Sequence, residues 1–195
     1  MRRSFGLIVP FLLSGSLLLA QPRLDQEQVN ILAPENTVVG GSPQQRFAQA
    51  FTVGRSGLLA FIAVPMGCQP VANVLVTVEE TTGGVPNGIV LARQTVPGTF
   101  FTAHPTPAVG MRLIQFDLPL RLQSGVTYAF TLDTVGGDCA LWTGPDGDTY
   151  TGGRAFFESA SNPPGWIELF FTPGTTRDLA FQVYLVDRWG RGGTK

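Results

Sequence analysis

The stretch Val126-Thr127-Tyr128-Ala129-Phe130-Thr131-Leu132-Asp133 indicates how this chain folds. Apolar side chains recur at every second position, at Val126, Tyr128, Phe130 and Leu132, and mostly polar residues stand between them. Successive side chains of a β-strand point to opposite faces. The alternation therefore predicts a strand with one face buried in a core.

The same pattern predicts further strands. The segments 73–79, 111–118 and 178–185 alternate in this way, and the continuous apolar run 58–64 is typical of a strand buried on both faces. Nine segments are expected as strands: 47–53, 58–64, 73–79, 89–96, 111–118, 126–132, 138–143, 154–158 and 178–185. Because no comparable stretch has a sustained helical period, the sequence predicts an all-β fold, an antiparallel β-sandwich.

Composition places the chain among globular proteins. Of its 195 residues, 44% are hydrophobic and only 14% are charged. The formal net charge is −1, and the longest basic run is Arg2-Arg3. Nucleic-acid binding requires a basic patch, so the sequence argues against a nucleic-acid partner.

The first twenty residues have the pattern of a secretory signal peptide. Arg2 and Arg3 give a positive start, an apolar stretch follows over Phe5–Leu19, and Ala20 supplies a small residue before the expected cut. The alternative is a retained membrane anchor, but Pro10 and several small polar residues interrupt a stretch that is short for a span. We expect a secreted or periplasmic protein whose mature chain has no membrane span.

The remaining chain divides into three expected parts. Residues 21–45 are polar and rich in turns, and we expect an N-terminal extended segment in which only 29–33 indicates a strand. Residues 46–186 form the sandwich domain, and 187–195 are expected to be a flexible C-terminal tail.

The chain has two cysteines, Cys68 and Cys139. In an oxidising compartment such a pair is expected to form a disulfide, and their wide separation does not suit a metal site. The alternative is two buried free thiols.

Several segments, in this order, resemble a group of uncharacterised secreted bacterial β-sandwich modules of the choice-of-anchor type. The segments that carry the resemblance are Phe47–Gly54 with Ser56–Leu59, Thr82–Gly88 with Leu91-Ala92, Leu122–Phe130, and Tyr150–Phe157 with Pro164–Trp166. The resemblance implies a jelly-roll-like sandwich, an extracellular setting and binding of a sugar or a surface. It supplies no catalytic residues.

The sequence gives little support for catalysis. The one histidine, His104, lies in a proline-rich stretch with no pattern that indicates an orienting partner or a nucleophile. A carboxylate pair could serve a glycoside hydrolase. The candidate acids are Glu79, Glu80, Asp117, Asp133, Asp138, Asp146, Asp148, Glu158 and Glu168. Sequence spacing does not show which of them converge, and solvated surface carboxylates are the alternative.

The segment from Trp142 to Tyr150 is a candidate ligand loop. Asp146 and Asp148 offer hard oxygen ligands for Ca²⁺, although Asp-Gly also forms turns. Aromatic rings can stack on sugar rings while nearby polar side chains accept hydrogen bonds from hydroxyls. The residues expected to bind a ligand in this way are Trp142, Asp146, Asp148, Tyr150, Asn162 and Trp166. Core packing of the rings is the alternative.

These observations lead to three functional hypotheses. The first is an exported, non-catalytic module that binds polysaccharide or cell-envelope glycan. The second is a structural or assembly component of the cell exterior, in which exposed strand edges pair with another chain. The third is a glycoside hydrolase with a carboxylate pair.

Overall fold

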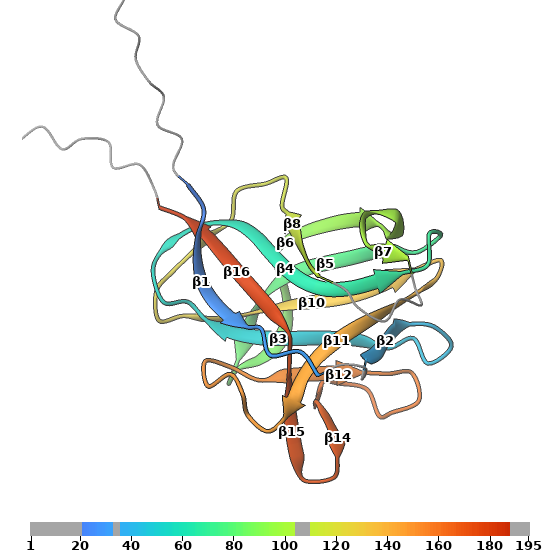
Figure 1. Ribbon diagram of the computed structural model, residues 1–195. Helices are drawn as coiled ribbons and strands as arrows, with labels where there is room; N and C mark the ends of the chain where they lie inside the picture. Colours follow the sequence, from blue (N-terminus) through green and yellow to red (C-terminus); the bar gives the residue numbers. More distant parts are fainter. Residues whose placement is uncertain (1–20, 33–35, 104–109, 188–195) are drawn as a thin grey trace, which may run out of the picture.

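The computed structural model describes residues 21–32, 36–103 and 110–187. The expected signal peptide (1–20), His104 and most of the expected tail (188–195) lie outside the described residues. Within them the only helix is a single 3-10 turn, η1 (Gly98–Phe100), and the rest of the regular structure is β (Figure 1).

The larger sheet has ten strands, with a main path in the order β1-β16-β4-β11-β15-β14. Beside this path, β2 pairs with β11, and β7, β8 and β9 pair with β4. Its strands are β1 (Arg23–Gln28), β2 (Asn36–Gly40), β4 (Gly57–Cys68), β7 (Thr102–Ala103), β8 (Met111–Gln115), β9 (Arg121–Leu122), β11 (Asp138–Asp146), β14 (Phe170–Thr172), β15 (Thr175–Leu179) and β16 (Phe181–Val186).

The smaller sheet has six strands in the order β13-β12-β3-β10-β5-β6. Its strands are β3 (Arg46–Thr52), β5 (Asn73–Thr82), β6 (Val85–Pro97), β10 (Thr127–Val135), β12 (Ala155–Glu158) and β13 (Ile167–Glu168). All pairings in the two sheets are antiparallel except the short β4–β7 pair.

The order of the strands is that of a jelly roll. One sheet contains β2-β11-β4-β8 and the other contains β3-β10-β5-β6, so the chain crosses repeatedly between the two layers. The twelve-residue strand β4 lies at the centre, with β11 and β16 along one edge and β7, β8 and β9 along the other. The predicted all-β, jelly-roll-like sandwich is confirmed.

The core lies between the inner faces of the two sheets. Phe51 and Phe130 face inward from β3 and β10, and both side chains are fully buried. The ring of Phe130 lies 5.6 Å from that of Phe181, which belongs to β16 in the other sheet. Alternate residues on each strand therefore supply the apolar layer that holds the sheets together.

The disulfide is present between Cys68 and Cys139, which are direct register partners on β4 and β11. The bond joins positions 71 residues apart in the sequence. It ties the last residue of the central strand to the strand that crosses back from the other sheet.

The described residues form more strands than the nine expected, because the short strands β7, β9, β13 and β14 lie outside the expected segments and the chain before residue 46 adds two more. Each of the nine expected segments overlaps a strand, but the segment 21–45 also contributes β1 and β2 to the larger sheet. The strand indicated at 29–33 is wrong, because 29–32 are irregular and residue 33 lies outside the described residues. β1 is polar because it is an edge strand that exposes much of its surface to solvent.

Replacing both cysteines by alanine should lower the free energy of unfolding by about 2–4 kcal/mol, because the unfolded chain then gains the freedom of a long open loop. Urea denaturation followed by circular dichroism measures this loss. The wild type in reducing buffer serves as the control and should show a similar loss. Identical transition midpoints with and without the bond would contradict the prediction.

Candidate functional site

The structure does not bring together the six residues expected to bind a ligand. Trp142 and Tyr150 are buried, with exposed fractions of 3% and 7%. Asp146 and Asp148 are exposed at the end of β11 and just beyond it. Asn162 and Trp166 lie in the connection between β12 and β13.

Trp142 packs against the larger sheet. A Cβ at Gly67, on the neighbouring strand β4, would lie 3.7 Å from the indole ring, so the ring occupies the space above the glycine. Aromatic side chains commonly cover a strand glycine in this way. The ring cannot offer an open face to a sugar, and the packing alternative holds for Trp142.

Tyr150 fills the core at one end of the sandwich. Its ring meets that of Phe181 edge to face, with centroids 5.0 Å apart. Its hydroxyl donates a hydrogen bond of 2.7 Å to Oε1 of Gln26, and burial raises the pKa of this hydroxyl. Tyr150 therefore joins β1 to the core instead of facing a ligand.

Asp146 is paired with an arginine. Its Oδ1 accepts hydrogen bonds from Nε and Nη2 of Arg177 at 3.0 and 2.6 Å, and its Oδ2 accepts one from Thr172 at 3.1 Å. The hydrogen bond from Arg177 is the main cause that lowers the pKa of Asp146. Because a guanidinium already neutralises this carboxylate, the arrangement does not favour the expected calcium site. In the part of the chain that the structure describes, no three acidic, histidine or cysteine side chains gather around a metal position.

Asp178 fixes the loop that follows β11. Its Oδ2 accepts hydrogen bonds from the backbone amides of Thr149 and Tyr150 at 3.0 and 2.9 Å, and its Oδ1 accepts one from Gln49 at 3.2 Å. Oε1 of Gln49 in turn accepts a hydrogen bond of 2.8 Å from the backbone amide of Leu179. Burial is the main cause that raises the pKa of Asp178.

The same region has a small hollow of about 30 Å³, lined in part by Asp148, Glu168 and Asp178. A space of this size holds about one water molecule and no sugar ring. These three carboxylates therefore do not form the substrate site of a glycosidase.

A larger open space lies at one end of the sandwich. Two hollows of about 680 and 350 Å³ share Gln44 and Arg46, and we call them together the end groove. The turn between β2 and β3, the turn between β10 and β11 and the loop after β12 surround it, and all three lie on the right in Figure 1. Further lining residues are Asp133, Thr134, Asp138, Glu158, Ser159 and Asn162.

Backbone contacts hold the walls of the end groove in place. The carbonyl of Pro43 accepts hydrogen bonds from the amide of Ala160 and the hydroxyl of Ser159, at 3.0 and 3.1 Å. On the other side, the hydroxyl of Thr134 contacts the carbonyls of Val39 and Gly137 at 3.3 and 2.9 Å. Gly40 lies so close to this hydroxyl that a side chain at residue 40 would collide with it.

Arg46 lies at the junction of the two hollows. Its guanidinium pairs with the Glu158 carboxylate, and its Cζ lies 4.7 Å from the centre of the Trp166 ring. Trp166 also packs against a small buried cluster formed by Ala48, Ala50, Ala129 and Phe156. The indole therefore supports Arg46, and the guanidinium covers the ring face that was expected to stack on a sugar.

The Glu158 carboxylate stays charged to a lower pH than an ordinary glutamate, because its pKa is lowered. Burial acts to raise the pKa of Glu158, but the amide of Gly165 and the guanidinium of Arg46 outweigh this effect and lower it. The Gly165 amide donates to Oε1 of Glu158 at 2.9 Å. The groove thus presents a fixed ion pair beside the amide side chains of Gln44 and Asn162, a set of donors and acceptors that suits a ligand with many hydroxyls.

These features define the chain as a jelly-roll β-sandwich with a polar groove formed by three loops at one end. A scan against protein-family models finds no match to the chain, and a search of curated proteins finds no relative. Within the described ranges, no helix has the length and apolar character needed to cross a membrane.

Trp142→Ala should lower the free energy of unfolding by about 3–5 kcal/mol, because it leaves a cavity above Gly67. Trp166→Ala should cost less, since Trp166 is half-buried. Thermal and urea denaturation of both variants provide the measurement, with Trp142→Phe as a conservative control. A smaller loss for Trp142→Ala than for Trp166→Ala would contradict the assignment.

Protonation of Asp178 should make the protein more stable as the pH falls through the raised pKa of this residue toward the pKa of an unfolded aspartate. The native carboxyl holds its proton to a higher pH than the unfolded one, whose ordinary value is about 3.9. The stability of the wild type relative to Asp178→Asn should therefore decrease as pH rises through this window and then level off. Urea titrations across the acid range measure the difference, and a constant difference would contradict the prediction.

Proposed function

We propose that this protein is an exported, non-catalytic module that binds polysaccharide or cell-envelope glycan in the end groove. The observation that carries the proposal is the end groove itself, in which three loops hold polar side chains around an open space of ligand size. The disulfide supports export, because such bonds persist in oxidising compartments.

The polar groups of the groove match the chemistry of a glycan. Sugar hydroxyls both donate and accept hydrogen bonds, and the amides of Gln44 and Asn162 do the same. Asp133 and Asp138 add acceptors on the opposite wall. Because Pro43 and Thr134 fix the loops before a ligand arrives, little conformational entropy is lost on binding.

The hydrolase hypothesis predicts a different outcome when the exported protein is incubated with a glycan. Asp133 and Asp138 share the larger hollow, so they are the pair that a hydrolase in this groove would use. A binding module retains bound glycan intact, and a hydrolase releases reducing ends that disappear in the Asp133→Asn and Asp138→Asn variants.

The assembly hypothesis has one specific observation in its favour. β6 is the last strand of the smaller sheet and, among the described residues, pairs along only one edge. Ile89 and Val90 on this strand are 53% and 40% exposed. An open edge with apolar side chains can pair with another chain, and concentration-dependent sedimentation tests for it.

A glycan array probed with the exported wild-type protein should show selective binding of a set of polysaccharides. Asn162→Ala and Gln44→Ala should each weaken that binding about fivefold, because each removes a hydrogen-bonding side chain from the groove. Trp166→Ala should weaken it further, because Arg46 loses its support. Calorimetric titration with the best array ligand gives the affinities.

Phe170→Ala is the matched control, since this ring is 46% exposed on β14 and does not line the groove. It should bind like the wild type. Equal affinities for the groove variants and the control would place the ligand elsewhere, and an array without any bound glycan would overturn the proposed function.

A further inference from the structure

The outer face of the larger sheet carries two side-by-side rows of register-paired residues. The first row crosses four strands as Leu24, Tyr184, Phe61 and Gln115. The second row crosses the same strands as Glu27, Gln182, Ala63 and Leu113. The residues between them, Ile62, Ile114 and Val183, are at most 1% exposed in the core, so the two rows lie on the outer face, where Ala63 of the second row is itself covered by its neighbours.

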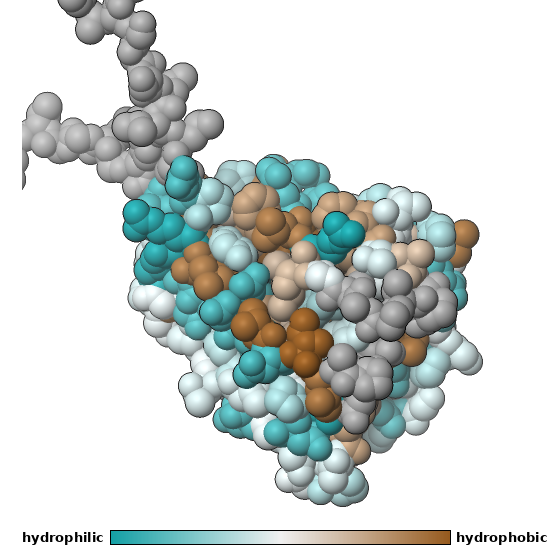
Figure 2. Space-filling view, viewed as in Figure 1, coloured by the Kyte–Doolittle hydropathy of each residue, from teal (hydrophilic) through white to brown (hydrophobic). Residues whose placement is uncertain are grey.

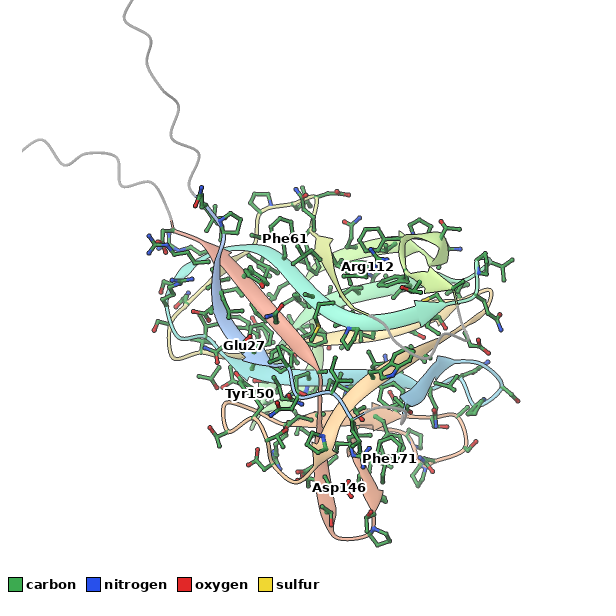
Figure 3. The ribbon with its side chains drawn as sticks, viewed as in Figure 1. Glu27, Phe61, Arg112, Asp146, Tyr150 and Phe171 are labelled. Atoms are coloured by element: carbon green, nitrogen blue, oxygen red, sulfur yellow. A yellow bond between two sulfur atoms is a disulfide. The ribbon has the colours of Figure 1, made fainter. Side chains whose placement is uncertain are left out.

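The first row presents two aromatic rings. Phe61 and Tyr184 are half-buried and meet edge to face, with centroids 6.5 Å apart and planes at 77°. Leu24 beside them is 39% exposed, and Leu113 in the second row is 49% exposed. Figure 2 shows apolar patches among polar ones on this face, and Figure 3 shows Phe61 and Glu27 on the side toward the viewer.

A chain of hydrogen bonds holds the polar groups beside these rings. The Tyr184 hydroxyl donates to Oε1 of Gln182 at 3.1 Å, and Nε2 of Gln182 donates to Oε2 of Glu27 at 2.9 Å. The ring of Tyr184 is therefore oriented by its own hydroxyl. The hydroxyl oxygen of Tyr184 and the exposed carboxylate of Glu27 keep lone pairs that can accept further hydrogen bonds.

We propose that this face, which we call the sheet platform, is a second glycan-binding surface, specific for a neutral oligosaccharide. The proposal rests on the ligand class of the proposed function but uses a surface separate from the end groove. The apolar C–H face of a sugar ring stacks on the ring of Tyr184, which meets Phe61 edge to face, and the sugar hydroxyls donate to Glu27 and bond with Gln182. One row spans roughly 14 Å, three strand spacings, which gives room for a short oligosaccharide.

The charges of the platform favour a neutral ligand. Glu27 is the only charged side chain in the two rows, and its partner is the neutral amide of Gln182. This carboxylate attracts hydroxyl donors and repels phosphates, uronates and acidic peptides. The end groove differs, because Arg46 gives it a cation.

The experiment titrates cellotetraose and chitotetraose, two neutral β-linked probes, into the exported protein by calorimetry, with tetragalacturonate as the anionic comparison. At least one neutral probe should bind, and Tyr184→Ala should weaken it about tenfold through loss of the ring. Tyr184→Phe keeps the ring and should cost about fivefold through loss of the hydroxyl. Leu113→Lys, at an exposed position that folding does not depend on, should weaken binding by obstructing the platform.

Phe170→Ala on β14 is the control, and it should leave binding of the neutral probe unchanged. Wild-type affinity in all three platform variants would overturn the sheet platform, and loss of array binding in the groove variants would then leave the proposed function standing. No binding of either neutral probe would also overturn the platform. A dimer that Leu113→Lys dissociates in sedimentation would identify the face as an interface between copies, which contradicts the proposal.

Discussion

The long central strand β4 is the constraint on which the larger sheet depends. Five other strands pair with its twelve residues: β11 and β16 along one edge, and β7, β8 and β9 along the other. Such a strand must satisfy its backbone groups on both edges. Leu59, Ile62 and Val64 bury their side chains in the core toward the opposite sheet, and Phe61 lies half-buried on the outer face. The Cys68–Cys139 bond closes one end of it. Both candidate surfaces take their geometry from this arrangement, because the platform lies on β4 itself and the end groove lies where β2 and β11 turn toward the other sheet.

Most of the fold could be predicted because burial leaves a two-residue period in the sequence. Phe130 and Val183 lie on strands with one core face, and alternation alone located those strands. β1 and β2 could not be found in this way. Their residues lie toward the edges of the larger sheet, where solvent accepts polar side chains, so pairing with β16 and β11 leaves no periodic apolar signal.

The candidate site was harder to predict, because exposure of an aromatic ring depends on residues far away in the sequence. Trp142 is buried because Gly67 leaves space beneath its ring. Tyr150 is buried because its ring packs against Phe181 and its hydroxyl donates a hydrogen bond to Gln26. The Gln49–Asp178 contact spans 129 residues and has no local pattern. Sequence reasoning did locate Asn162 in an open region. It missed Arg46 and Gln44, whose importance comes from the meeting of three loops, and it missed Phe61 and Tyr184, whose outward direction follows from register.

The end groove and the sheet platform limit the loss of side-chain entropy on binding in different ways. The groove suits hydrogen bonds to sugar hydroxyls, and the platform suits stacking of a sugar ring. In the end groove, loops are tied together by hydrogen bonds to the Pro43 carbonyl and by the Arg46–Glu158 pair, so polar groups are fixed around a hollow. On the platform, the strands themselves fix the rings, and the hydroxyl of Tyr184 orients its own side chain through Gln182. Sugar hydroxyls exchange water for protein partners with little net gain in free energy. A protein that binds them must therefore hold its side chains in place beforehand, and both surfaces do so with contacts that exist without a ligand.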